Sequence, residues 1–433
     1  MYLYHTKIGI KFINWASKKF GKILKPLQYI SVIVGYVLMI LIVYFLVKFA
    51  IFYLSSPSAA RILKVPVLMP LIPYLPELFK IDFLPPFYFA YWIIIIAIIA
   101  IPHEFAHGIF ARLNKIKINT TGFGFLGPFL AAFVNPNEKQ MTKSSKFSQL
   151  SVLAGGTFAN VIMTILFLLV LWGFFALAFS PAGAMFNIYA TSMANTSDIT
   201  SINGILFTNP NQISQFSNST FINLTINNQT FFTDPKILQQ TFQNNISKIV
   251  VFDDSPAFNA QLKGAIAQIN GKKIPNQVQL RAEILSKKPG DIIIITTIDS
   301  NKIVNNYTIK LAERNGKPFL GIGVIPASGS GFTGWIYSVI TKIKDPAIYY
   351  QSSIGDLGIF IFDLLWWIVL INISVALVNM VPVGLFDGGR FFMLTLWGIT
   401  RNEKFAQRAF SVSTWFFILL VIFMMIRWVL AFT

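Results

Sequence analysis

The sequence predicts a polytopic α-helical membrane protein of about six transmembrane segments, with a β-rich α+β domain inserted outside the membrane. Apolar residues make up 55% of the 433 residues, and only 12% are charged, against about 25% in soluble domains. Long apolar runs alternate with Lys-rich segments, and one long region is instead rich in Asn, Ser, Thr and Gln. The chain has no cysteine, which excludes disulfides and thiolate metal sites.

Four apolar runs have the length of about 20 residues that a helix needs to cross a bilayer. They are Tyr29–Leu54, Phe87–Leu113, Leu150–Phe179 and Trp415–Phe432. A fifth apolar region, Ile354–Gly398, is interrupted by Asn379, Pro382 and Asp387-Gly388-Gly389. It is long enough for one span and a broken second piece.

Positive charge predicts the orientation of these spans. Lysine or arginine is concentrated in residues 1–27, in the segment after the second span and in the segment after the interrupted region. We place all three in the cytoplasm of a cell whose plasma membrane holds the protein, so that the spans alternate in direction and residues 181–350 lie outside. The net charge of +18 is then a matter of orientation, and no nucleic-acid partner is expected.

Four domains are predicted. Residues 1–85 hold the basic N-terminal tail, the first span and an outside loop, and residues 86–180 and 331–433 form the two parts of a membrane core. Residues 181–330 form the outside domain, where the β-branched runs Asp291–Ile298, Ile303–Leu311 and Ile246–Phe252 predict strands. Six Asn-x-Ser/Thr sequons in this domain suit exposed loops outside the cytoplasm.

The outside domain contains a weak internal echo. Ser180-Pro-Ala is followed by Ile-Asn-Gly204, and Ser255-Pro-Ala is followed by Ile-Asn-Gly271. The second copy, over residues 246–325, resembles a PDZ domain of the bacterial protease type, in which Ser-Pro-Ala opens a helix and Ile-Asn-Gly ends a strand in a tight turn. The resemblance implies a peptide C-terminus as a partner, bound by strand addition. The alternative is a rigid β-rich cap.

The segment His103-Glu104-Phe-Ala-His107 lies inside the second apolar run. On a helix, His-Glu-x-x-His places both imidazoles on one face, where they can share a zinc ion, and the glutamate can act as a base toward zinc-bound water. Ionisable residues within a membrane span are rare and usually functional. The pattern therefore predicts a metalloprotease whose active site lies in the membrane. The alternative is a histidine pair that is hydrogen-bonded within a helix bundle.

A catalytic zinc usually has three protein ligands. Asp387 is the best candidate for the third, because Pro382 breaks the helix before it and Gly388-Gly389 allows close backbone packing. The charge-derived topology places His103, His107 and Asp387 toward the cytoplasmic ends of their spans. His5 lies in the basic tail, and Asp363 would lie nearer the outside. A helix-capping role for Asp387 is the alternative.

These motifs together resemble the site-2 protease family of intramembrane zinc metalloproteases. The resemblance rests on HEFAH and on Asn379-x-x-Pro382-x-x-x-x-Asp387-Gly, and further on Ala154-Gly-Gly156-Thr-Phe-Ala-Asn160. The stretch Gly122-Phe-Gly124-Phe-Leu-Gly-Pro, continuing to Asn135, is similar to the family's membrane-dipping β-hairpin. The family often has a second Pro and Leu-Asp-Gly where this chain has Gly384 and Phe386-Asp387-Gly388.

The resemblance implies one zinc per chain, held by His103, His107 and Asp387, with Glu104 as the acid and base. It suggests that Asn160 steadies the substrate or the developing oxyanion and that Asn379 binds substrate backbone. Pro382, Gly122 and Gly124 belong to the other stretches expected to meet substrate, and the Gly122–Gly127 stretch is a candidate edge strand for holding it. The implied partners are the bilayer and the transmembrane segment of a regulatory protein, cut after a first cut outside.

Two other functions are compatible with the sequence. One is a non-enzymatic transporter or membrane scaffold with a metal-stabilised core, which would not need Glu104. The other is a membrane-anchored zinc protease that cuts cytoplasmic loops. That enzyme type generally uses a glutamate as its third ligand, and no glutamate of this chain lies in a suitable apolar setting.

Overall fold

The computed structural model describes residues 2–55, 71–79, 84–126, 129–299, 301–325, 338 and 341–430. The chain divides into two compact units, one formed by Met1–Phe174 with Ile359–Thr433 and the other by Phe175–Gly358. The predicted inserted domain, residues 181–330, falls within the second unit. Its last five residues, 326–330, lie outside the described residues.

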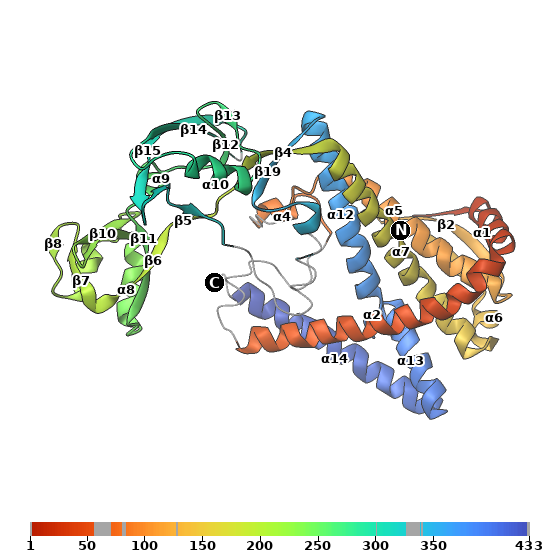
Figure 1. Ribbon diagram of the computed structural model, residues 1–433. Helices are drawn as coiled ribbons and strands as arrows, with labels where there is room; N and C mark the ends of the chain where they lie inside the picture. Colours follow the sequence, from red (N-terminus) through yellow and green to blue (C-terminus); the bar gives the residue numbers. More distant parts are fainter. Residues whose placement is uncertain are drawn as a thin grey trace. The chain divides into compact units, whose positions relative to one another are not determined.

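The first unit is mainly helical (Figure 1). Its helices are α1 (Ile8–Lys19), α2 (Gly21–Ser55), α4 (Leu75–Leu78), α5 (Phe89–Leu113), α6 (Glu138–Lys143), α7 (Lys146–Ala178), α12 (Gly355–Asn379), α13 (Asp387–Thr400) and α14 (Glu403–Leu430). Among the described residues, five helices are long and apolar enough to cross a membrane: α2, α5, α7, α12 and α14. The protein is an integral membrane protein.

Within the described residues there are five spans, close to the predicted number of about six, because the second piece of the interrupted region is short. Helix α13 has 14 residues, which at about 1.5 Å per residue falls well short of a hydrocarbon core of about 30 Å. The interruption itself lies where the sequence predicts it, since α12 ends at Asn379 and α13 begins at Asp387. A Cβ on Gly388 would lie 2.6 Å from the Cα of Met380, so this glycine permits the close packing of the two segments.

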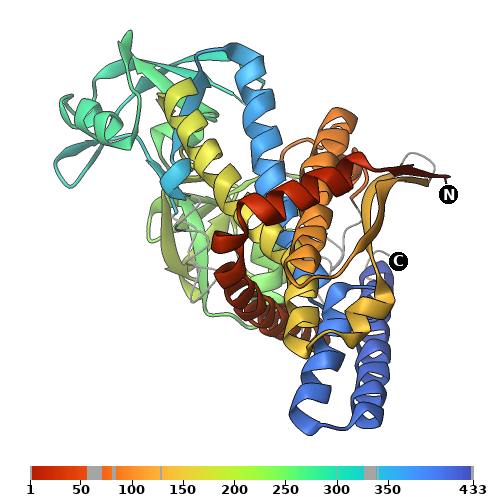
Figure 2. The ribbon, with the colours of Figure 1, turned by 90° about the vertical axis from the view of Figure 1, so that its right-hand side faces the viewer.

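The predicted β-hairpin is present before α7. Strand β2 (Ile118–Leu126) pairs antiparallel with β3 (Phe129–Pro136). The sequence did not predict the third strand of this sheet, β1 (Tyr2–Thr6), which pairs with the other edge of β2 (Figure 2). Gly122 is therefore flanked by His5 on one side and Phe133 on the other.

This pairing corrects the expectation that the Gly122–Gly127 stretch offers an edge strand. Gly122 and Gly124 lie in the middle strand of the described sheet, which has the order β1-β2-β3. Gly127, the last residue of the expected stretch, lies outside the described residues. A strand added from another chain would meet β3 or β1 instead.

The second unit is built largely of strands. They are β4 (Phe179–Ala184), β5 (Ile188–Tyr189), β6 (Thr191–Asn195), β7 (Ile199–Ile202), β8 (Ile205–Leu206), β9 (Ile222–Ile226), β10 (Gln229–Thr233), β11 (Lys248–Asp253), β12 (Ala265–Ile269), β13 (Lys272–Lys273), β14 (Ile292–Ile298), β15 (Val304–Lys310), β16 (Ala312–Arg314), β17 (Lys317–Phe319), β18 (Ile322–Gly323) and β19 (Ile348–Ser352). The helices are α8 (Pro235–Gln243), α9 (Pro256–Asn259) and α10 (Gln277–Leu285), and two 3-10 turns cover Thr196–Asp198 and Pro210–Phe216. The three predicted strands are confirmed as β14, β15 and β11.

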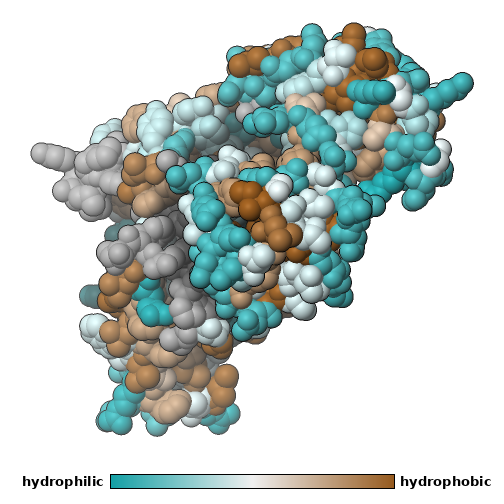
Figure 3. All heavy atoms as spheres, turned by 90° about the vertical axis from the view of Figure 1, so that its left-hand side faces the viewer, coloured by the Kyte–Doolittle hydropathy of each residue, from teal (hydrophilic) through white to brown (hydrophobic). Residues whose placement is uncertain are grey.

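Two sheets divide the second unit into two hydrophobic cores. One sheet has the order β6-β11-β10-β9-β7-β8 and the other β15-β14-β12-β4-β19. Leu224 and Val251 are fully buried in the first core, and Ile266 and Ile295 in the second. Polar residues predominate on the face of this unit that Figure 3 shows, as expected for a domain in water.

The internal echo is only partly present in the structure. Both Ile-Asn-Gly segments end in the same left-handed turn, with φ values of 50° and 80° at Asn203-Gly204 and 50° and 79° at Asn270-Gly271. Ser255 precedes helix α9, as the PDZ resemblance predicts, whereas Ser180-Pro-Ala lies in strand β4. Only the second copy therefore has the helix that the motif opens.

Candidate active site

Three side chains that can bind a metal converge in the first unit. His103 and His107 lie one turn apart on α5, and Asp387 is the first residue of α13. Oδ2 of Asp387 is 3.4 Å from Nε2 of His103 and 3.3 Å from Nε2 of His107. The two Nε2 atoms are 3.1 Å apart, and all three ligand atoms lie within 4.8 Å of one another.

The other nitrogen of each imidazole faces helix α7. Nδ1 of His107 lies 2.7 Å from the backbone carbonyl oxygen of Val152. A carbonyl only accepts, so Nδ1 carries the proton and Nε2 of a neutral His107 keeps its lone pair for a metal. Nδ1 of His103 lies 3.2 Å from the side-chain amide nitrogen of Asn160, a residue with no exposed surface.

A glycine allows α7 to approach the two imidazoles. A Cβ on Gly156 would lie 2.6 Å from Nε2 of His103 and would also overlap Nε2 of His107. Such contacts are too short for any side chain, so only glycine fits at position 156. The Ala-Gly-Gly motif of the sequence thus forms the wall behind the histidines.

Glu104 lies between the metal-binding group and the hairpin. Its Oε2 accepts a hydrogen bond of 2.9 Å from the backbone N–H of Val134 in β3. Strand β3 is the end strand of the described sheet, so the hydrogen bond joins Glu104 of α5 to that strand. The carboxylate that can act as a base is therefore beside the end strand of the hairpin sheet.

A pocket of about 360 Å³ contains these groups. Its lining includes His103, Glu104, His107 and Asp387, together with Asn379. Its other residues are Val134, Pro136, Glu138, Met141, Val152, Leu153, Leu385, Phe386 and Arg390. Polar groups thus concentrate at one place within an apolar helical unit, as expected of a reaction site.

Comparison with known families agrees with this geometry. A model of peptidase family M50 matches residues 91–423, which include the histidine pair, the hairpin, Asn160 and Asp387. The chain belongs to peptidase family M50, the site-2 protease family. No curated protein matches the chain. The assignment makes this M50 protein an intramembrane metallopeptidase.

The donor set of the M50 protein fits a zinc ion. Two imidazole nitrogens and one carboxylate oxygen are the ligand types that catalytic zinc sites use, with a further position left for water. The hydrogen bond to Val152 fixes the ring of His107 in the tautomer that binds through Nε2. The fit therefore rests on the side chains and on the backbone that orients one of them.

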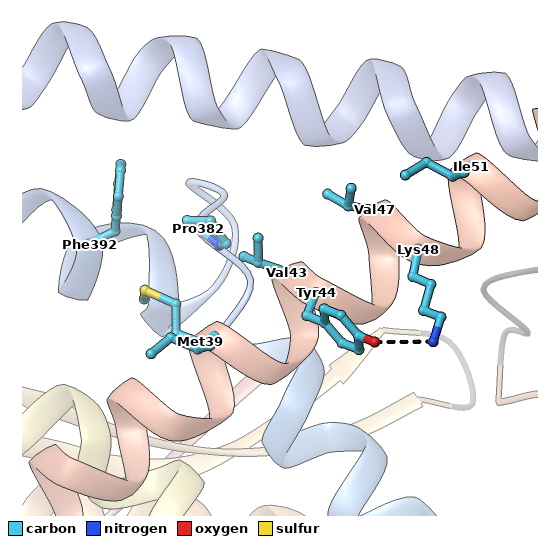
Figure 4. Close-up of a pocket in the computed structure, with 9 residues that line it drawn as sticks. Met39, Val43, Tyr44, Val47, Lys48, Ile51, Pro382 and Phe392 are labelled. Atoms are coloured by element: carbon cyan, nitrogen blue, oxygen red, sulfur yellow. Dashed lines mark hydrogen bonds between the residues drawn. The ribbon is translucent and has the colours of Figure 1, made fainter. Parts of the chain in front are cut away.

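The remaining sequence-predicted residues occupy different places. Asn379 lines the pocket, whereas Gly122, Gly124 and Pro382 are not among its lining residues. Pro382 instead borders a groove along α2 (Figure 4). His5 lies in β1 and Asp363 in α12, and neither is a member of the metal-binding group.

The sequence did not point to several residues of the pocket. Val134 and Val152 contribute backbone atoms, which leave no side-chain signature. Arg390 and Glu138 form a two-bond ion pair with N–O distances of 3.1 and 3.3 Å. Arg390 follows Asp387 by three residues on the same helix, and this spacing is the signal that places it near the metal ligand.

Proposed function

We propose that the protein is a zinc endopeptidase that cleaves transmembrane segments of membrane-anchored regulatory proteins. The cut would be the second in regulated intramembrane proteolysis. The observation that carries this proposal is the convergence of Asp387 with His103 and His107, beside Glu104, on the membrane-crossing helix α5. One such group is present among the described residues, which supports one zinc per chain.

The chain's own residues suit hydrolysis of a peptide bond. When bound, zinc polarises the scissile carbonyl and lowers the pKa of a water molecule toward about 7. Glu104 accepts the proton of the attacking water and later delivers it to the leaving amine. Asn379, which lines the same pocket, is the side chain proposed to bind substrate backbone.

The free edge of β3 is the proposed site for an unwound substrate. A peptide bond within a helix is shielded by its own hydrogen bonds, so a transmembrane substrate must unwind before it is cut. An extended segment can then pair with an exposed strand edge. Strand β3 is the end strand of the described sheet, and its Val134 N–H donates to Glu104 rather than to another strand, which supports strand addition directly beside the base.

An apolar groove supports lateral entry from the bilayer. It is lined by Met39, Val43 and Val47 of α2 and by Pro382 and Phe392 on the other side (Figure 4). Pro382 belongs to the short segment between Asn379 and Asp387, both of which line the metal-binding pocket. A substrate helix in this groove would lie against the segment that precedes the metal ligand Asp387.

The second unit contains a groove suited to a peptide C-terminus. A cavity of about 640 Å³ is lined by Leu280 and Ile284 of α10 and by residues 318–322 and Val324. Gly321 lies between β17 and β18 with a φ of +89°, and left-handed residues occur in the backbone nests that bind carboxylates. This groove supports a peptide-binding role for the PDZ-like region, which would screen out substrates that have not been trimmed.

The proposed location is the plasma membrane, with the N-terminus in the cytoplasm and residues 181–350 outside, as the lysine distribution suggests. The function is tested by reconstituting the protein in liposomes with a single-span substrate and zinc. Site-specific cleavage by the wild type and none by Glu104→Gln supports the proposal. Cleavage by neither protein, with solute transport by both, would favour a transporter.

A further inference from the structure

Asn160 is fully buried behind the metal-binding group. It lies in α7 with 0% exposed surface, and it is not among the residues that line the metal-binding pocket. Its side-chain oxygen, Oδ1, has no hydrogen-bond partner within the described residues. Its side-chain nitrogen lies 3.2 Å from Nδ1 of His103. Asn160 therefore faces the back of a metal-ligating ring, one helical turn after Gly156.

The proposed role of His103 as a zinc ligand determines which of its ring nitrogens carries the proton. Nε2 of His103 faces Asp387 and Nε2 of His107, so Nε2 must present its lone pair to a metal. In a neutral imidazole the proton is then on Nδ1, which needs an acceptor. Helix α7 supplies that acceptor to His107 as the carbonyl of Val152. The group that faces Nδ1 of His103 is the Asn160 amide.

We propose that Asn160 is a positioning residue, whose side-chain oxygen accepts a hydrogen bond from Nδ1 of His103. The oxygen and nitrogen of an asparagine amide exchange places by a half-turn of the side chain. That half-turn brings the unpaired buried Oδ1 to the histidine and gives the amide a proton to accept. The inference rests on the proposed zinc site. In it, Asn160 orients the zinc ligand His103 and does not contact the substrate or the oxyanion.

Two substitutions separate this role from a general packing role. Asn160→Leu is similar in size and cannot accept a proton, whereas Asn160→Asp keeps an acceptor oxygen. The matched control is Asn372→Leu, because Asn372 is also fully buried in a membrane helix and its side-chain oxygen also has no partner among the described residues. Asn372 is outside the metal-binding group and its pocket.

The measurement is zinc affinity in detergent by competition with a chromophoric chelator. Asn160→Leu should weaken zinc binding by about 10- to 100-fold, as loss of an outer hydrogen bond to a ligand typically does. Asn160→Asp and Asn372→Leu should bind zinc within a few-fold of the wild type. Unchanged affinity in folded Asn160→Leu would overturn the inference, even if the protein cleaves its substrate.

A second measurement needs no variant. The chain has three histidines, so nitrogen spectra of histidine-labelled, zinc-loaded protein are simple enough to assign. We expect His103 to be protonated at Nδ1, with the proton slow to exchange, and His5 to show no zinc-dependent change. Protonation of His103 at Nε2 would overturn the inference. Zinc binding that depends on Asn160, without cleavage of any substrate, would instead disprove the proposed function alone.

Discussion

The backbone N–H of Val134 donates a 2.9 Å hydrogen bond to Oε2 of Glu104. This bond joins the proposed base to the edge strand of the hairpin. The same N–H is one that an added substrate strand would use for pairing. Substrate binding at β3 would therefore take over a partner of Glu104 and leave the carboxylate free for water.

Replacing Glu104 by Gln should strongly slow proteolysis and leave the fold intact. The Gln side-chain oxygen can still accept from Val134, so the link to β3 is retained, but the amide cannot take a proton from water. We expect a decrease in kcat of about 10²- to 10⁴-fold, the usual contribution of a general base. Cleavage of a reconstituted single-span substrate measures the rate, and metal analysis should show unchanged zinc. Loss of zinc together with activity would mean that Glu104 has a structural role.

Replacing Val134 by Pro should weaken substrate binding. Proline removes the N–H that faces the free edge, and it is tolerated where that N–H is outside the ladder. The matched control is Val134→Ala, which keeps the N–H and removes only side-chain atoms. We expect KM to rise about 10-fold or more for Val134→Pro and little for Val134→Ala, with zinc content equal in both. An equal effect of the two substitutions would point to side-chain packing instead.

Adding one methyl group at Gly156 should empty the metal site. The new Cβ of Gly156→Ala would overlap the Nε2 atoms of His103 and His107, so the imidazoles must move away from Asp387. Gly173→Ala is the control on the same helix, because a Cβ there meets nothing within 4 Å. It should be neutral or stabilising by up to about 1 kcal/mol, since alanine favours a helix over glycine. Zinc content and thermal unfolding of both variants check this prediction.

The local patterns of the sequence predicted the parts of the site that reside in side chains on single elements. HEFAH specifies a helical face, and the pair of glycines after Asp387 specifies a close approach to the preceding segment. Both are short-range features, visible within about ten residues. They are sufficient to place His103, His107 and Asp387 together once the two helices pack.

The parts that the sequence did not predict depend on pairing between distant segments. Strand β1 pairs with β2 across more than one hundred residues, and a five-residue run before a basic helix has no pattern that names such a partner. This pairing changes β2 from an edge strand to a middle strand. Val152 contributes only a backbone oxygen, which any residue type would provide. Long-range register and backbone acceptors are therefore what a single sequence leaves open.

The proposed orientation can be tested with single cysteines, because the chain contains none. Ser145 lies between α6 and α7, and Ser217 lies in the second unit; both are exposed. In sealed right-side-out vesicles, a membrane-impermeant maleimide should label Ser217→Cys at once and Ser145→Cys only after the membrane is opened. Labelling of both from the outside would contradict the lysine-derived topology.

The wall of the peptide groove should lose stability in acid. Glu283 of α10 is paired with Lys272 at 2.6 Å and Lys287 at 2.7 Å, and only 7% of its side chain is exposed. The hydrogen bond from Lys272, followed by that from Lys287, lowers the pKa of Glu283 from its usual 4.5. A carboxyl whose pKa is lowered by folding stabilises the folded state above its ordinary pKa, and that contribution is lost as the pH falls through the lowered value.

At neutral pH, Glu283→Gln should therefore speed hydrogen exchange of the α10 amides relative to the wild type, and this difference should disappear in strong acid. Glu313→Gln, at an exposed position on β16, is the control and should leave α10 unchanged. A difference between Glu283→Gln and wild type that persists at low pH would show that shape rather than charge matters at this position.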